Sequence, residues 1–279
     1  MPRLQKILKI LILFALILLT LRLFFLDAYT ILTKSMENTI RAGDFILVNK
    51  FVYGAKTPEY IPILNFDIPG FRMPRMRSPE KNDVVVIEKE SLPVDLRGYQ
   101  ADFIKRIIAG PEDTLEIRNN AIYINGVRVK KPEGVIFGLN RDDKRSLFPE
   151  RQKWSKDNYG PITVPKAGTK IRLTAENYRD WIDLIKKETY PESDIRVNGG
   201  IIIDDKKLEE YEIRNNYYFV MGDNRNNSID SRYWGFIDEE SIIGKVFLVY
   251  WSIDPSVERS GISGFFSGIR WNRIGAFID

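Results

Sequence analysis

A long apolar run near the N-terminus limits what this chain can fold into. Residues 10–26 read ILILFALILLTLRLFFL, and only Thr20 and Arg22 interrupt the run. Seventeen residues are close to the shortest helix that spans a bilayer, and apolar residues continue toward the N-terminus. A helix in a globular core would show a polar face, which this run lacks. We therefore expect a transmembrane helix over residues 7–26.

The charges on either side of the run predict its orientation. Arg3, Lys6 and Lys9 precede it and Asp27 follows it, so the positive-inside rule places the N-terminus in the cytoplasm and the rest of the chain outside. A cleaved signal peptide is the alternative. It needs a small-x-small site after the run, and FFLDAYT (residues 24–30) offers no good one. We favour a retained anchor.

The composition excludes several classes of protein. With 42 Lys and Arg against 38 Asp and Glu, the net charge of +4 is too small and dispersed to indicate nucleic-acid binding. The absence of Cys excludes a disulfide scaffold, and the absence of His removes both the usual general base and the commonest metal ligand. We expect no metal site. One basic cluster fits either a solvated loop or a site for phosphate or anionic lipid: Arg72, Arg75, Arg77 and Lys81.

Beyond the anchor, the pattern is mainly that of β-strands. FILVNKFV (residues 45–52) and DVVVIE (83–88) are short β-branched runs, and YYFVM (217–221) and KVFLVYW (245–251) repeat the pattern. Asn125-Gly126, between two alternating segments, is typical of a tight β-hairpin. The pattern predicts a mainly β core.

Two segments depart from this pattern. A Pro-rich stretch over residues 56–79 is best interpreted as a surface excursion. Residues 130–211 are polar loops around one clear helix, 174–187, and we interpret them as an inserted mixed α/β subdomain. The predicted organisation is a cytoplasmic N-terminus (1–6), the anchor (7–26), the first part of the core (27–129), the insertion (130–211) and the second part of the core (212–279).

The stretch ILTKSMENTIRAGD (residues 31–44) contains Ser35, a candidate nucleophile. In a chain without His, its proton could pass only to a carboxylate or a lysine. A carboxylate is too weak a base, and a lysine works only where burial keeps it neutral. Lys105 has apolar neighbours (Phe103, Ile104, Ile107, Ile108) and fits such a setting. Alternatively, it points to solvent from an alternating strand.

The stretch GDNRNNSIDSRYWG (residues 222–235) packs charged and hydroxyl side chains together after a strand. It reads either as a polar loop with surface ion pairs, or as a support that hydrogen-bonds a neutral lysine and braces it with Asp–Arg pairs.

Taken together, these segments resemble the bacterial type I signal peptidase (leader peptidase) family, which uses a Ser–Lys dyad. The resemblance rests on SMxxTxxxGDFILVxK, FIKRIIAGP and GDNRxNSxDSRYWG, in this order behind an anchor. It implies a signal-peptidase-type β-sheet core and a membrane-bound serine endopeptidase that needs no cofactor. The implied substrates are precursor proteins that carry signal peptides, cleaved after small-x-small sites on the outer side of the bacterial inner membrane.

The resemblance also implies roles for individual residues. Ser35 corresponds to the nucleophile, Lys105 to the general base and Thr33 to a hydroxyl that helps bind the oxyanion. Ser228 matches a serine that orients the lysine. Asp230 and Arg232 match a supporting ion pair, and Asp223 is expected to pair with Arg106. The residues expected to contact the substrate are Ile31, Leu32, Met36, Ile40, Phe103 and Ile104.

The chain departs from the family pattern at three positions. Asn38 stands where the family usually has Pro, Asn82 stands in place of the Gly of R-G-D, and Glu112 replaces the Gly of P-G-D. The last two make the local turn geometry an open question. The segment 264–277 mixes aromatics with Arg270 and Arg273, which suits a membrane interface and a packed terminus equally.

Two other functions compete with this hypothesis. A self-cleaving Ser–Lys regulator of the LexA-like kind would need a DNA-binding helix-turn-helix where the anchor stands. A non-catalytic, membrane-tethered β-domain with a binding or structural role gives no reason for Ser35, Lys105 and the Asp/Arg/Ser stretch to coexist. Membrane lipid is an expected partner of the anchor, and the oligomeric state is left open.

Overall fold

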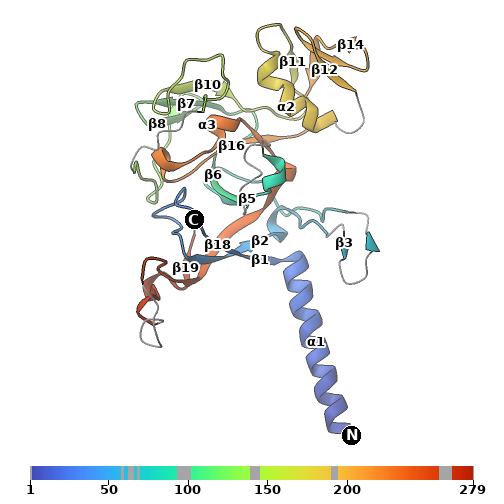
Figure 1. Cartoon of the computed structure of the whole chain (residues 1–279), viewed down its shortest axis with the longest axis vertical. Coiled ribbons are helices and arrows are strands. Elements are labelled where there is room, and N and C mark those ends of the chain that lie inside the picture. The colour runs from blue at the N-terminus through green and yellow to red at the C-terminus, as the bar shows by residue number, and fades with distance from the viewer. Residues whose placement is uncertain are drawn as a thin grey trace.

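The computed structural model describes residues 2–57, 60–61, 66–67, 70–92, 102–138, 145–189, 194–257 and 266–278. Helix α1 (Pro2–Phe24) stands apart from the rest and is long and apolar enough to cross a membrane. Figure 1 shows it extending away from the strands, and no part of its apolar window is buried. The helix ends two residues before the predicted span does, because Leu26 already begins the first strand.

The main sheet confirms the predicted β architecture. Its order is β1–β2–β18–β5–β6–β16–β17, with β19 pairing with β18, and all neighbours are antiparallel. Its strands are β1 (Leu26–Thr30), β2 (Asp44–Asn49), β5 (Val84–Ile87), β6 (Phe103–Ala109), β16 (Tyr217–Met221), β17 (Ile237–Asp238), β18 (Ile242–Ser252) and β19 (Ala276–Phe277).

The main sheet is covered on both faces, as β5 illustrates. Successive side chains of a strand point to opposite faces. Val84 and Val86 pack into one buried cluster, with Met36 and Ile46, while Val85 and Ile87 pack into another. A strand buried on both faces reads as a continuous apolar run, which is why VVVI shows no alternation. The centre of the sheet is therefore a dry environment for any polar side chain placed there.

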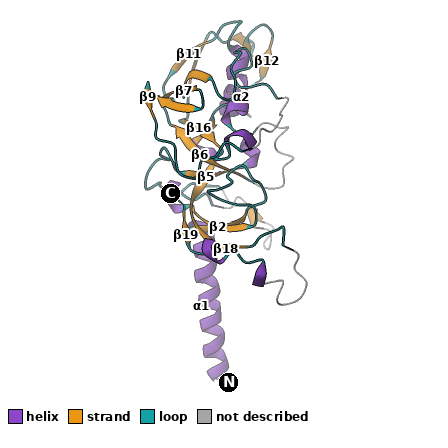
Figure 2. Ribbon diagram, turned by 90° about the vertical axis from the view of Figure 1, so that its left-hand side faces the viewer, coloured by secondary structure: helices purple, strands orange, loops and turns teal. Residues whose placement is uncertain are grey.

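A second group of elements lies at the end of the molecule opposite α1 (Figures 1 and 2). A four-stranded sheet has the order β10–β7–β8–β9, and helix α2 (Tyr178–Thr189) lies beyond it with two small sheets. Their strands are β7 (Thr114–Arg118), β8 (Ala121–Ile124), β9 (Val127–Arg128), β10 (Tyr159–Thr163), β11 (Lys170–Arg172), β12 (Ile195–Val197), β13 (Ile201–Ile203), β14 (Lys206–Lys207) and β15 (Glu210–Glu212). Because β10 pairs with β7, this sheet joins residues from both sides of the predicted boundary at residue 130.

Two sequence predictions concern shorter segments. The hairpin at Asn125-Gly126 is confirmed, since β8 and β9 pair and both turn residues have positive φ. In the Pro-rich stretch, β3 (Tyr60–Ile61) pairs with β4 (Phe66–Asp67). Pro58, Pro62 and Pro69 lie outside the described residues.

The three departures from the family pattern share one backbone feature. Asn38, Asn82 and Glu112 have φ values of 81°, 75° and 68°. Glycine adopts this left-handed conformation without strain, which explains the glycine that the family has at the last two positions. Proline fixes φ near −65°, so the backbone at Asn38 could not accommodate it. The turn after Ser35 therefore differs from one built on proline.

Glu112→Gly should stabilise the protein. A left-handed conformation costs an ordinary residue about 1–2 kcal/mol, and glycine returns roughly 0.5–1 kcal/mol of that as unfolded-state entropy. The ion pair of Glu112 with Lys166 is exposed and contributes little. We expect the free energy of unfolding, measured by urea titration in detergent, to rise by about 0.5–1 kcal/mol.

Glu133→Gly is the matched control, because Glu133 is an exposed loop residue without positive φ. It should lower the free energy of unfolding by about 0.5 kcal/mol. Equal destabilisation by both substitutions would contradict the strain at Glu112.

Candidate active site

The serine lies in a loop that joins β1 to β2, which we call the nucleophile loop (residues 31–43). Two backbone hydrogen bonds close its base, from Ile31 N to Asp44 O (2.9 Å) and from Gly43 N to Ile31 O (2.8 Å). Inside the loop, the buried side chain of Met36 joins the core beneath the sheet. Ser35 is therefore held in place by the hydrogen bonds that close the loop and by the buried side chain of Met36 next to it.

A buried carboxylate ties this loop to the C-terminal segment. Asp44 has no exposed surface and accepts hydrogen bonds from Arg273 Nη2 (2.6 Å) and Ser252 Oγ (2.6 Å). Arg273 also donates to the carbonyl of Thr39 inside the loop (2.9 Å). Of the two interpretations of segment 264–277, this favours a packed terminus at its arginines, although Trp271 and Phe277 remain exposed.

Lys105 reaches the serine from the centre of the sheet. It lies on β6, pairs with Val85 of β5, and has Phe103 and Ile107 on the same face of its strand. Its side chain is only 2% exposed, which excludes the interpretation in which it points to solvent. Its Nζ lies 3.0 Å from Ser35 Oγ and donates to the carbonyl of Ile104 at 3.0 Å. Serine and lysine are thus within hydrogen-bonding distance.

The surroundings of the amine disfavour its charged form. Burial lowers the pKa of Lys105 to about 8, against the opposing pull of Asp230 and Asp223, which favour the ammonium. Among the described residues, no carboxylate forms an ion pair with it. A large part of the lysine is therefore neutral at slightly alkaline pH, and a neutral amine has a lone pair that can accept a proton.

The stretch after β16 supplies the two expected ion pairs. Arg106 donates to Asp223 at 2.9 Å, and Arg232 donates to Asp230 at 2.8 Å. All four side chains are buried. Each carboxylate accepts a further hydrogen bond. Asp230 accepts from Gly222 N (3.1 Å), and Asp223 accepts from Thr39 Oγ1 (2.6 Å). Such pairs have little freedom to move, so they fix the position of the stretch relative to β6.

Two hydroxyl groups were expected to assist. Thr33 Oγ1 lies 3.5 Å from Ser35 Oγ. The N–H of Ser35 donates to no acceptor among the described residues, so it is free to bind an oxyanion. Ser228 is buried beside Gly222, but its hydroxyl has no partner of good geometry within the described parts of the chain. The expected contact between Ser228 and Lys105 is therefore not formed in this structure, and the role of Ser228 stays a prediction.

The six residues expected to contact the substrate differ in accessibility. Leu32 is 66% exposed, and Phe103 and Ile104 are partly buried. Ile31 and Met36 are nearly buried, and Ile40 has no exposed surface because it packs in the core with them. Ile40 can therefore shape a pocket only from behind.

Three further contacts, which were not predicted from the sequence, hold the nucleophile loop. Asn224 donates from its N to Ser35 O (3.0 Å) and from its side chain to Lys34 O (3.1 Å). Thr39 Oγ1 donates to Asp223 (2.6 Å), which links the loop to the ion pair of Arg106. Asn224 lies inside a quoted motif, so its position was a usable signal.

The cluster of four basic residues between Arg72 and Lys81 forms hydrogen bonds and ion pairs within the protein. Arg72 donates to the carbonyls of Gly54 (2.9 Å) and Ile242 (2.8 Å). The other three form ion pairs: Arg75 with Glu239, Arg77 with Asp83 and Lys81 with Asp113. These contacts favour a structural role over a lipid or phosphate site.

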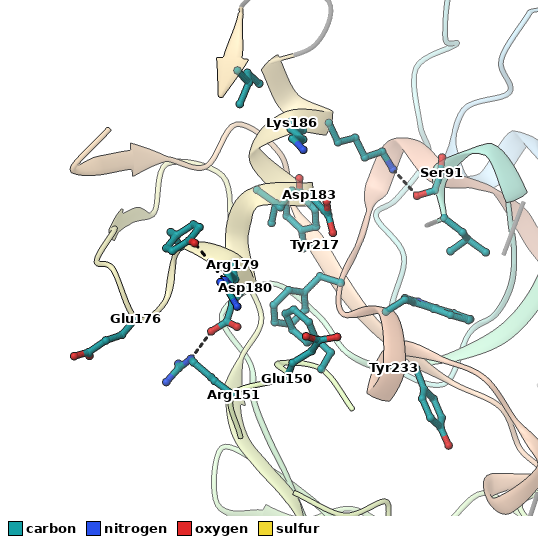
Figure 3. A pocket seen from close by; sticks show the side chains of 18 of the residues that line it. Ser91, Glu150, Arg151, Glu176, Arg179, Asp180, Asp183, Lys186, Tyr217 and Tyr233 are labelled. Carbon is teal, nitrogen blue, oxygen red and sulfur yellow. Dashed lines mark hydrogen bonds and ion pairs between the residues drawn. The ribbon is translucent and has the colours of Figure 1, made fainter. Parts of the chain in front are cut away.

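A large groove lies elsewhere, between α2 and the main body. It has a volume of about 1360 Å³, and neither Ser35 nor Lys105 lines it. Figure 3 shows its mixed charges, with Arg151 and Asp180 pointing toward each other as an ion pair. Within the described ranges, no three acidic side chains gather as a metal site would require. This groove is therefore separate from the Ser35–Lys105 pair.

Comparison with known proteins agrees with this geometry. Signal peptidase I of Buchnera aphidicola (from Schizaphis graminum) is 30% identical over 91% of this chain and 76% of its own length. Signal peptidase I of Aquifex aeolicus is 30% identical (84% and 79%), and that of Pseudomonas aeruginosa is 30% identical (89% and 72%). A crystal structure of a signal peptidase I from Enterococcus faecalis aligns with a TM-score of 0.31 at 20% identity, over 61% of this chain and 97% of that one, which is too loose to use as evidence of fold.

The family described as "Signal peptidase, peptidase S26" matches residues 4–251, which include most of α1 and all of the nucleophile loop, β6 and the stretch after β16. The match therefore covers the whole of the site described above except Arg273 and Ser252. On this evidence, the chain belongs to the S26 family of signal peptidases.

Proposed function

We propose that this chain is a membrane-anchored serine endopeptidase that removes signal peptides from exported precursor proteins. Ser35 is the nucleophile and Lys105 the general base. One observation carries the proposal: in a chain without histidine, the only buried lysine of the described core lies 3.0 Å from an accessible serine hydroxyl. Membership of the S26 family supports the same reaction.

The reaction follows from this pair. Neutral Lys105 accepts the proton of Ser35 Oγ as the oxygen attacks the scissile carbonyl, and the ammonium then donates that proton to the leaving amine. Water attacks the resulting acyl-enzyme, with Lys105 again accepting a proton. The N–H of Ser35 and the hydroxyl of Thr33 stabilise the oxyanion in both steps. No cofactor takes part in these steps.

The ion pairs around the site assist by controlling charge. Two aspartates near an amine would stabilise its protonated form and make it a poor base. Arg106 and Arg232 each neutralise one of them, and Arg232 itself lowers the pKa of Lys105. The pairs thereby support a lysine that loses its proton near pH 8.

The position of the site suits a substrate that is itself in the membrane. Only β1 and the start of the nucleophile loop separate Phe24, the end of α1, from Ser35. Five residues in a strand span about 17 Å, so the serine stays near the membrane surface. The positive charges before the apolar run support a topology with the N-terminus in the cytoplasm and the catalytic part outside the inner membrane.

Substitution of either member of the pair should abolish cleavage. We expect Ser35→Ala, Lys105→Ala and Lys105→Arg each to reduce the rate of precursor processing by at least roughly 10²-fold, because a guanidinium stays protonated and cannot act as a base. The double alanine variant should be no worse than either single one. Lys170→Arg, at an exposed strand lysine, is the control and should process normally. Residual activity above a few per cent in Lys105→Arg contradicts the lysine-base mechanism.

The pH dependence should report the lysine. Because the neutral amine is the active form, kcat/KM should rise with pH through about 8 and level off above it. A profile measured with a purified precursor in detergent checks this. A rising limb near pH 4 would assign the base to a carboxylate, and one above pH 10 would mean that burial does not lower the pKa of Lys105.

The size of the residues before the cut should decide processing. The branched side chains of Ile31, Leu32 and Ile104 narrow the space beside Ser35, which leaves room for Ala, Gly or Ser. Leu or Phe at the first or third position before the cut should therefore block cleavage of a precursor. The same replacement at the second position is the control and should be tolerated. Normal processing of the first two variants would mean that these pockets do not select the substrate.

A further inference from the structure

A second groove, which we call the basic groove, lies on the side of the nucleophile loop opposite to α1. It has a volume of about 730 Å³ and is lined in part by β8 and the segment that follows β9. Five cationic side chains line it: Lys81, Arg128, Lys130, Lys131 and Arg225. None of the described residues that line it is acidic. Its charge is therefore suited to an anion.

Arg225 is an unbalanced charge at the floor of this groove. Its side chain is 3% exposed, and its Nε and Nη2 have no hydrogen-bond partner among the residues that the structure describes. The two nearby carboxylates are already used, Asp223 by Arg106 and Asp230 by Arg232. Burial and the neighbouring arginine lower the pKa of Arg225 to about 10. A buried, unpaired guanidinium is costly unless an anion reaches it.

The walls of the groove extend this positive charge to the surface. Arg128, Lys130 and Lys131 are exposed, and none forms an ion pair within the described ranges. Lys131 lies over the ring of Phe137, 5.8 Å from its centroid, which holds its amine at the groove. Only Lys81 has a carboxylate partner, Asp113 at 3.2 Å. Three free cations thus surround the entrance above Arg225.

The position of the groove distinguishes its possible ligands. Arg225 directly follows Asn224, whose N–H donates to Ser35 O, so the groove begins next to the nucleophile. Figures 1 and 2 show β8 and β9, which border the groove, in the half of the molecule away from α1. A lipid headgroup at the membrane surface cannot easily reach it. A peptide that passes Ser35 and continues away from the membrane can.

We propose that the basic groove binds acidic side chains in the first residues of the mature part of a precursor, just after the cleavage site. The inference rests on the proposed function, because it identifies the peptide as a substrate that enters from the membrane side. The carboxylate is drawn to the exposed lysines and directed toward Arg225. Exposed charges act at long range and are screened by salt, so the effect is a preference and weakens as ionic strength rises.

The test compares three precursors that differ only in the first six residues after the cut. These residues include Asp and Glu in the acidic precursor, Asn and Gln in the neutral one, and Lys in the basic one. With the full chain in vesicles of zwitterionic lipid at low salt, we expect kcat/KM to be about fivefold higher for the acidic than for the basic precursor. Lys130→Glu with Lys131→Glu should remove or reverse this preference and leave the neutral precursor unaffected. Lys206→Glu with Lys207→Glu, an exposed pair on β14, should keep it.

A binding measurement separates this proposal from the proposed function. A fluorescent peptide with only the acidic mature residues is titrated into the full chain carrying Ser35→Ala. We expect Lys130→Glu with Lys131→Glu to weaken its binding about fivefold. An unchanged preference and unchanged peptide binding overturn the proposal, even if precursors are cleaved. If the substitutions lower cleavage of all precursors equally, and only in vesicles with anionic lipid, the groove binds lipid headgroups and the proposal is wrong.

Discussion

Burial of the Lys105 amine is the constraint on which the rest of the site depends. An ammonium at this position would lose its hydration without a bonded carboxylate to replace it, so the neutral form is favoured. The sheet creates this environment because β5 is buried on both faces and lies beside β6. The same burial that makes the core stable therefore also lowers the pKa of the lysine, as the proposed mechanism requires of its base.

Charges near the amine are arranged so that they nearly cancel. Asp223 and Asp230 are each matched by an arginine from a different place in the chain, one from β6 and one from the helix α3 (Ser231–Trp234). A buried ion pair contributes little to stability by itself, since its desolvation offsets its attraction. Here the main effect of the pairs is to fix the position of the stretch after β16 against the nucleophile loop. Arg225 is the one guanidinium of this group that the described chain leaves unmatched.

Much of this was predictable from local sequence, and the rest depends on distant contacts. The anchor, the Asn125-Gly126 hairpin and the two Asp–Arg pairs follow from short patterns or from family motifs. Periodicity could not decide whether Lys105 faces solvent, because a strand covered on both faces shows no alternation. The contact of Asp44 with Arg273 and the unpaired state of Arg225 could not be predicted, since each depends on partners far away in the sequence. The lack of a contact at Ser228 depends on rotamers that a motif does not specify.

The contact between Asp44 and Arg273 has a consequence for the biogenesis of the protein. Asp44 closes the base of the nucleophile loop, and Arg273 lies in the 3-10 turn Trp271–Arg273, 229 residues later in the chain. A chain is made from its N-terminus, so the nucleophile loop exists well before Arg273 does. It can gain this contact only after the segment around Arg273 has been made and β19 has paired with β18. The full set of contacts that holds the loop therefore forms late in folding.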